Sequence, residues 1–264
     1  MGIIDTRVGR IGVDERGGGE ALPILFLHGV GSDKSVWRPQ LEYFGGTRRA
    51  LALDYPGYGE SEPGDAGGHD AFAAAVLAAM DALGVAKAHL CGLSLGGVVA
   101  IALHAAAPHR CASLVLADSF AVHPEGGAIY QRSIEASWTM TMRALAEARV
   151  DVLLGRAASA KLRAEVIETM AAIEPDAYRV AAAAVWLADQ RARAEAVAVP
   201  ALVLCGTEDR VTPPALSDEL AALVPGARLA MIEGAGHLAN AEQPDAFNKS
   251  TESFISEVER NMLS

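Results

Sequence analysis

Short hydrophobic runs alternate with amphipathic stretches along much of the chain. Between the runs, apolar residues recur at helical spacing, as Phe72, Val76 and Met80 do ahead of Gly84. Strands that alternate with helices are typical of a largely parallel sheet with crossover helices, so the pattern predicts an α/β fold. Six runs have the apolar character of strands that are buried on both faces: 23–27, 49–53, 88–91, 113–117, 200–205 and 228–232.

The alternation stops between residues 121 and 197. This segment has apolar residues at helical spacing, as at Leu162 and Val166, and contains no run that is typical of a strand. The pattern therefore predicts a helical insertion at 121–197. The two remaining parts, 1–120 and 198–264, are expected to form one α/β core.

The composition is that of a globular protein. Of 264 residues, 51% are hydrophobic and 21% are charged, and 33 Asp and Glu outweigh 22 Lys and Arg to give a net charge of −11. Such a chain has no overall basic field to attract nucleic acid or anionic lipid. We expect a small-molecule substrate and neither a nucleic-acid nor a membrane partner, with homo-oligomerisation left open.

The cysteines and the first twenty residues bear on the cellular compartment. Cys91 and Cys205 lie inside apolar runs, and with Cys111 they make an odd number, which favours buried reduced thiols over a disulfide framework. Residues 1–20 carry several charges and no apolar stretch of the kind that secretory leaders contain. A cytoplasmic location is expected.

The strongest chemical signal is the segment Gly92–Gly97, which reads Gly-Leu-Ser-Leu-Gly-Gly. It follows the apolar run 88–91 and precedes a helix-compatible stretch, which is the strand–turn–helix context of a nucleophile elbow. Such a turn strains the backbone of its serine, and the flanking small residues let backbone segments pass closely. The context predicts Ser94 as a nucleophile at the carboxyl edge of the sheet.

A serine hydroxyl needs a base, and the partners of such an elbow follow it in the order acid, then histidine. Asp209 and His237 each follow a predicted strand and therefore belong to loops at the active edge of the sheet. Ser94, Asp209 and His237 are the predicted catalytic residues. Asp118 and Glu208 remain alternative acids, since each also follows a strand.

A third element is the turn Leu27–Gly31, Leu-His-Gly-Val-Gly, at the end of the first long apolar run. A turn at this place can direct a backbone N–H at an oxygen that becomes negative, so the N–H groups of Val30 and Leu95 are the predicted oxyanion hole. His28 is expected to brace the loop by hydrogen bonding. A dinucleotide-binding turn is excluded, because Lys34 stands where its third glycine would be.

These residues together resemble the α/β-hydrolase superfamily, and the likeness covers nearly the whole chain. The resemblance implies an eight-stranded, mostly parallel sheet with helices on both faces. It also implies that the insertion at 121–197 is a helical cap over the substrate pocket. Five motifs fall in the order and spacing of the superfamily: His28–Gly31, Asp54–Ser61, Gly92–Gly97, Gly206–Asp209 and Gly236–His237.

Within the superfamily the sequence is most similar to 3-oxoadipate enol-lactonases. The similarity lies in Cys91–Gly97, Thr212–Leu216, Pro225–Leu229 and His237–Phe247. It implies a serine hydrolase that opens 3-oxoadipate enol-lactone or a similar carboxylated lactone through an acyl-enzyme. His28-Gly29 departs from those lactonases and matches the form found in general esterases and carbon–carbon bond hydrolases.

Three alternatives therefore stay open. Two keep the catalytic residues: a carbon–carbon bond hydrolase that acts on a ring-fission product, and a broad carboxylesterase. A non-catalytic binding protein with a hydrolase fold is a third, and it is disfavoured because the serine, the acid and the histidine are all present.

The pocket is the least determined part of the prediction. Trp37, Trp138 and Trp186 are expected to line it. Acyl transfer on a serine needs no cofactor, and no paired His or Cys spacing typical of metal ligands is found, so neither a metal nor a cofactor is predicted. A carboxylated substrate needs a cation near the cap, and four arginines are candidates: Arg132, Arg143, Arg191 and Arg210.

Overall fold

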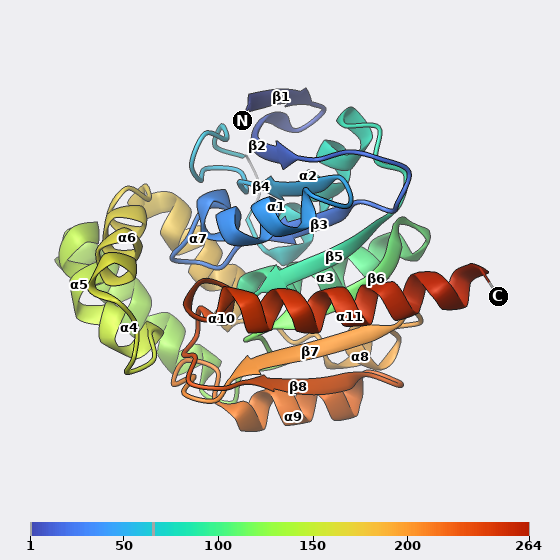
Figure 1. Cartoon of the computed structure of the whole chain (residues 1–264). Helices are drawn as coiled ribbons and strands as arrows, with labels where there is room; N and C mark the ends of the chain where they lie inside the picture. Colours follow the sequence, from blue (N-terminus) through green and yellow to red (C-terminus); the bar gives the residue numbers. More distant parts are fainter. Residues whose placement is uncertain (1, 65–66, 264) are drawn as a thin grey trace.

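A single eight-stranded sheet runs through the middle of the molecule (Figure 1). The structure, a computed structural model, describes residues 2–64 and 67–263. The strand order is β1-β2-β4-β3-β5-β6-β7-β8. The strands are β1 (Gly2–Thr6), β2 (Gly9–Arg16), β3 (Ile24–Leu27), β4 (Ala50–Leu53), β5 (Ala88–Leu93), β6 (Cys111–Ala117), β7 (Ala201–Gly206) and β8 (Arg228–Ile232).

The six strands from β3 to β8 are parallel, and they match the six hydrophobic runs to within two residues at each end. β1 and β2 are antiparallel and extend the sheet beyond β4. Apolar runs did not reveal these two strands, because β1 lies at the sheet edge with no buried residue and β2, Gly-Arg-Ile-Gly-Val-Asp-Glu-Arg, has no continuous apolar run. The eight-stranded, mostly parallel sheet implied by the family resemblance is confirmed.

Helices cover both faces of this sheet (Figure 1). On one face Phe26 of β3 packs in a core with Phe44 and Phe247, and on the other face Leu27 packs in a core with Phe72 and Val98. Successive side chains of one strand thus pack in two different hydrophobic cores, one on each face of the sheet. The helices of the first face are α1 (Arg38–Phe44), α10 (Ala239–Glu242) and α11 (Pro244–Leu263), and those of the second are α2 (His69–Ala82), α3 (Leu95–Ala106) and α9 (Pro214–Leu223).

Five helices and no strand lie between β6 and β7, as the loss of alternation in the sequence predicted. α8 packs against α3 and α9, and the other four lie at the carboxyl edge of the sheet (Figure 1). The division of the chain at residues 121 and 197 stays a prediction. The helices are α4 (Gly126–Thr139), α5 (Met142–Leu153), α6 (Ala160–Ala171), α7 (Pro175–Trp186) and α8 (Arg191–Glu195).

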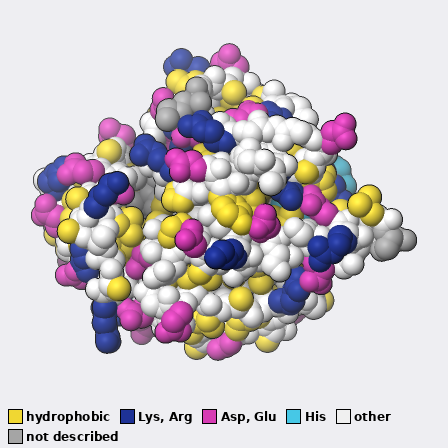
Figure 2. Space-filling view, in the orientation of Figure 1, with side chains coloured by type: hydrophobic (Ala, Val, Ile, Leu, Met, Phe, Trp, Pro, Cys, Tyr) yellow, Lys and Arg dark blue, Asp and Glu magenta, His cyan; other side chains and the backbone are white. Residues whose placement is uncertain are grey.

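The surface charges and the state of the cysteines are those expected from the composition. Lys and Arg side chains are interspersed with Asp and Glu over the face shown in Figure 2. The three cysteines are free and buried, as predicted. In residues 2–64 and 67–263 there is no helix with both the length and the apolar character that a membrane span requires.

A buried histidine at the amino end of β5 makes stability depend on pH. Burial lowers the pKa of His89 to about 4, and its ring hydrogen-bonds the Ser113 hydroxyl (2.8 Å) beside Glu259. The unfolded chain, with a histidine pKa near about 6.5, binds more protons between these values, so stability falls as the pH falls. Between pH 7 and pH 5 we expect His89 to cost about 2 kcal/mol of unfolding free energy.

Urea unfolding at the two pH values tests this contribution. His89→Gln is expected to lose less stability than the wild type on acidification, whatever its stability at pH 7. Equal losses in both proteins would show that His89 is not the titrating group.

Candidate active site

The predicted nucleophile lies in a sharp turn between β5 and α3. Ser94 has φ 55° and ψ −114°, a left-handed conformation that non-glycine residues rarely adopt. A Cβ added at Gly92 would collide with the backbone of Gly96, and one added at Gly96 would collide with the carbonyl of Leu27. The two glycines are therefore required by close backbone approach, which is the physical reason for the motif around Ser94.

This crowding leads to a prediction for Gly96→Ala. Because the neighbour is backbone that cannot move aside, we expect the variant to lose about 3 kcal/mol of unfolding free energy. Gly127, also in a helix, has no atom within 4 Å of an added Cβ. Gly127→Ala should stay within about 0.5 kcal/mol of the wild type. Chemical denaturation measures both, and equal stabilities would contradict the steric argument.

His237 and Asp209 form a hydrogen-bonded pair behind the serine. The Nδ1–H of His237 donates to Oδ2 of Asp209 at 2.9 Å. The Thr212 hydroxyl donates to the same oxygen at 2.6 Å, and the N–H groups of Val211 and Thr212 donate to the other oxygen at 2.8 and 3.0 Å. With Nδ1 occupied as a donor, Nε2 of His237 is left as the ring nitrogen that can accept a proton.

The electrostatics distinguish Asp209 from the alternative acids. Burial opposes the charge of Asp209, but the attraction of His237 and the hydrogen bonds from His237 and Thr212 outweigh it, so the pKa of Asp209 lies below its usual value. Burial and repulsion by Asp209 raise the pKa of Asp118 well above its ordinary value. Glu208 accepts the N–H of Arg156, away from the imidazole. Of the three acids, Asp209 contacts His237.

One group of residues in the described part of the chain has the spacing of metal ligands. Asp118, Cys205 and Asp209 place their ligand atoms within 4.8 Å of one another. Burial raises the pKa of the Cys205 thiol to about 12, so the sulfur keeps its proton at neutral pH. The oxygens of Asp209 are already occupied by donors. This chemistry suits a hydrogen-bonded acid better than a metal ion.

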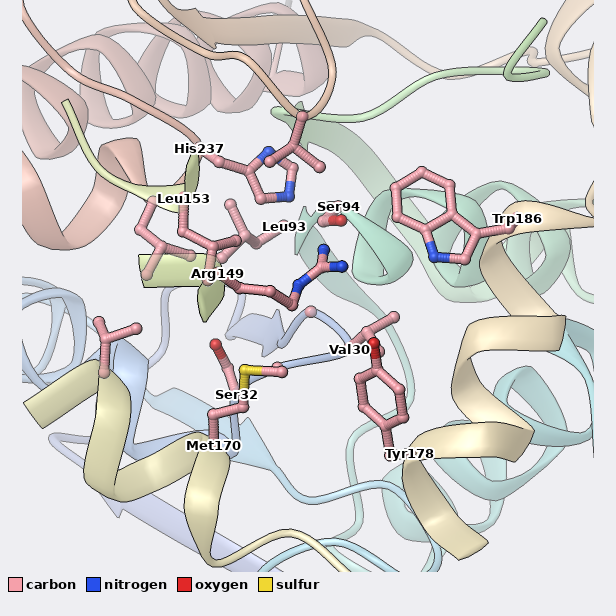
Figure 3. A pocket seen from close by; sticks show the side chains of 15 residues that line it. Val30, Ser32, Leu93, Ser94, Arg149, Leu153, Met170, Tyr178, Trp186 and His237 are labelled. Carbon is pink, nitrogen blue, oxygen red and sulfur yellow. The ribbon is translucent and has the colours of Figure 1, made fainter. Parts of the chain in front are cut away.

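Ser94 and His237 line one cavity beside helices α5, α6 and α7 (Figure 3). A ring nitrogen of His237 points toward Ser94 in this view. Both side chains are 4% exposed, so water is largely excluded around them. The rest of the lining is mostly apolar and comes from α5, α6 and α7, from the end of β5 and from the loops after β3, β7 and β8. Its apolar members include Leu93, Leu153, Val166, Met170, Tyr178, Trp186, Val211 and Leu238.

The two predicted oxyanion donors flank this cavity. Val30 lines it and Leu95 follows the serine as the first residue of α3. Among the hydrogen bonds of the described residues, neither N–H has a protein acceptor. The Nδ1–H of His28 donates to the Gly29 carbonyl at 2.8 Å and Nε2 accepts the Tyr55 N–H at 3.3 Å, which confirms that His28 braces the loop.

A buried ion pair holds the same loop from the other side. Lys34 donates through its ammonium to Asp54 at 2.5 Å and through its backbone N–H at 2.8 Å. The ammonium also pairs with Glu60 at 2.8 Å. The segment that carries Val30 is therefore tied to the Asp54–Ser61 motif, which explains that motif as support for the Val30 loop.

The structure corrects two of the three tryptophan predictions. Trp186, at the end of α7, lines the cavity. Trp37 does not: it is fully buried and stacks on Phe26 with ring centroids 4.9 Å apart. Trp138 lies on the surface, 69% exposed, with the Arg179 guanidinium over its ring. Large aromatic side chains serve equally well in cores and on surfaces, so residue type alone misplaced these two.

The cation beside the serine is Arg149 of α5, which the sequence did not single out. Its guanidinium extends into the cavity that Ser94 and Val30 line (Figure 3). In the described residues it makes no ion pair. Arg143 and Arg191, two of the predicted candidates, instead pair at the surface with acids: Glu168 and Asp189.

A set of hydrogen bonds, also missed from the sequence, joins the loop after α5 to the loop that carries His237. Glu242 accepts the N–H of Gly155 at 2.7 Å and the N–H of Gly236 at 2.9 Å. The N–H of His237 donates to the Leu153 carbonyl at 2.8 Å. The loop between α5 and α6 is therefore fixed directly to the loop that carries the imidazole.

Most of the chain is similar to known hydrolases. Residues 24–250 match the model of the alpha/beta hydrolase family. The 3-oxoadipate enol-lactonase 1 of Acinetobacter baylyi is 26% identical over 260 residues, which are 97% of this chain and 97% of that protein. A candidate carbamate hydrolase of Azorhizobium caulinodans is 28% identical over 92% of this chain and 94% of its own.

The fold comparison agrees with the sequence comparison. The crystal structure of the enol-lactonase from Burkholderia xenovorans LB400 superposes with a TM-score of 0.88 and 28% identity, covering 97% of this chain and 100% of that one. The family match thus spans the six parallel strands from β3 to β8, the elbow at Ser94 and the loop of His237. This chain is a hydrolytic enzyme that belongs to the alpha/beta hydrolase family.

Proposed function

We propose that the protein is a serine hydrolase that cleaves a small carboxylic ester or lactone, with 3-oxoadipate enol-lactone or a similar carboxylated lactone as the substrate. The observation that carries the proposal is the hydrogen bond from His237 to Asp209, because His237 lines the same cavity as the strained Ser94. The similarity to enol-lactonases supports the choice of substrate.

The chemistry follows from this arrangement. His237 takes the hydroxyl proton as Ser94 attacks the carbonyl carbon, and Asp209 stabilises the imidazolium that forms. The N–H groups of Val30 and Leu95 bind the oxyanion, at roughly 3–4 kcal/mol for each donor. The bond to the leaving oxygen then breaks, and that oxygen takes the proton from His237. Water, deprotonated by the same imidazole, releases the acid and restores the serine.

Arg149 is the reason to prefer a carboxylated substrate. A guanidinium without a carboxylate partner in a mostly apolar cavity is costly to desolvate, and an anionic substrate offsets that cost. In this proposal residues 121–197 act as the cap over a core formed by 1–120 and 198–264. The cap supplies Arg149 and the core supplies Ser94.

The experiment is the hydrolysis of 3-oxoadipate enol-lactone, followed by ultraviolet absorbance. Arg149→Gln is expected to lower kcat/KM for this lactone about 10- to 100-fold more than it lowers kcat/KM for an uncharged lactone, because the variant loses a charge-assisted hydrogen bond to the substrate. Arg143→Gln is the matched control, because Arg143 lies on the same helix but pairs with Glu168 at the surface.

Two other results of this experiment would change the proposed substrate. Turnover of short p-nitrophenyl esters without lactone turnover would keep the serine hydrolase and discard the lactone. Cleavage of a coloured dienoate instead of either substrate would favour the carbon–carbon bond hydrolase.

A further inference from the structure

A second, larger cavity adjoins the Ser94 cavity. It has a volume of about 420 Å³ and lies between α4, α5 and the loops after β6 and β7. Arg149, Trp186 and Val211 line both cavities and therefore form the wall between them. A ligand held at Ser94 has to pass these three side chains to enter the second cavity.

The lining of the second cavity combines cations with apolar side chains. Arg132, Arg149 and Arg210 face it, against one acid, Glu125. In the described residues Arg132 and Arg149 make no ion pair, and the guanidinium of Arg210 donates to the backbone carbonyls of Asp151 and Leu154. Three guanidinium groups without carboxylate partners give this cavity a locally positive lining in a chain with a net charge of −11. They favour an anionic ligand.

The apolar side chains of the lining indicate that the rest of the ligand is apolar. Ile129, Leu145, Val152 and Pro213 contribute to it, so the cavity can accept methylene groups as well as an anion. A chain with a terminal carboxylate satisfies both parts of the lining.

The position of His237 determines which half of an ester substrate, the acyl chain or the leaving group, points toward the second cavity. The leaving oxygen must lie near His237, which protonates it. Figure 3 shows His237 and Trp186 on opposite sides of Ser94. The leaving group therefore occupies the His237 side, and the acyl chain runs past Trp186 toward the second cavity.

We propose that the second cavity binds the terminal carboxylate of an acyl chain, and that the enzyme also hydrolyses linear half-esters of medium-chain dicarboxylic acids. This inference rests on the proposed function, since the ester is cleaved by Ser94. The scissile bond joins the acyl carbon to the ester oxygen; water supplies the hydroxyl of the new acid and a proton for the alcohol. Arg132 and Arg210 hold the far carboxylate.

The test compares pairs of esters that differ only in the terminal charge. Mono-p-nitrophenyl adipate and suberate are measured beside the same esters with the far carboxylate capped as a methyl ester. The wild type is expected to have a kcat/KM at least tenfold higher for the free carboxylate. In Arg132→Gln the ratio of charged to capped substrate is expected to fall about tenfold, and in Arg132→Glu further. Arg143→Gln should keep the wild-type ratio.

A filling variant gives a second readout. Ala136→Phe places a ring in the second cavity, and it should lower kcat/KM for both suberate esters relative to p-nitrophenyl acetate. A ratio of charged to capped substrate near one, or a ratio unchanged in Arg132→Gln, would overturn the inference. If the enzyme hydrolyses p-nitrophenyl acetate through Ser94 but shows no such preference, only the inference fails. If no ester is cleaved, the proposed function fails with it.

Discussion

Ser94→Ala is expected to lower kcat for the best ester or lactone substrate by roughly 10⁶-fold, because the variant has no oxygen that can form the acyl-enzyme. The remaining rate would come from the oxyanion donors and from binding. Removal of the Ser94 hydroxyl should not disturb the fold, because this hydroxyl makes no hydrogen bond to another described residue. Single-turnover kinetics with a chromogenic ester measures the loss.

A matched control separates chemistry from folding. Ser113 is a buried serine of β6 that hydrogen-bonds His89 far from the cavity. Ser113→Ala should keep most of the activity, and Ser94→Ala should unfold at a temperature close to that of the wild type. A Ser94→Ala protein that is folded and keeps more than about 1% of the wild-type kcat would contradict the proposed mechanism.

Asp209→Asn is expected to lower kcat about 10⁴-fold while the fold is kept. The amide cannot stabilise the imidazolium, and its NH₂ group can donate to Nδ1 of His237, which favours the tautomer that carries its proton on Nε2 and cannot accept one from Ser94. KM should change little, since Asp209 does not line the cavity. Steady-state kinetics resolves the effects on kcat and KM.

Asp118→Asn provides the contrasting case. Its Oδ1 accepts the Gly206 N–H at 2.8 Å, which an asparagine oxygen can do as well. Burial and repulsion by Asp209 raise the pKa of Asp118, so its surroundings disfavour a negative charge that asparagine lacks. We expect this variant to keep activity within about tenfold of the wild type. If Asp118→Asn is inactive and Asp209→Asn is active, the acid of the catalytic group is Asp118.

Local sequence predicted those parts of the site that depend on local backbone geometry. The elbow requires small residues at positions 92 and 96, because the backbone passes too closely for any Cβ, and this requirement is visible as a motif. Asp209 and His237 were found because a parallel sheet places the ends of all its strands at one edge. The pairing of His237 with Asp209 then follows from chain order and topology.

Side chains that act through tertiary contacts left no comparable signal. Arg149 differs from Arg143 only in which side of α5 it occupies, and α5 has to be packed beside the carboxyl edge of the sheet before that side becomes a cavity wall. Thr212 holds Asp209, three positions away, by a hydrogen bond from its hydroxyl. Glu242 holds the loop of His237 and also accepts the N–H of Gly155, which is 87 positions away in sequence. Periodicity could not reveal them.

The sequence by itself determined the alternation of strands and helices, the serine in its elbow and the order of the acid and the histidine. These depend on short-range steric rules and on burial patterns that every parallel sheet shares. Only the tertiary structure decided that Trp186 and not Trp37 or Trp138 faces the cavity, and that Arg149 is the cation beside Ser94. The physical reason is that a pocket is defined by the surfaces of several elements at once, and the direction in which a cap side chain points depends on how those elements pack.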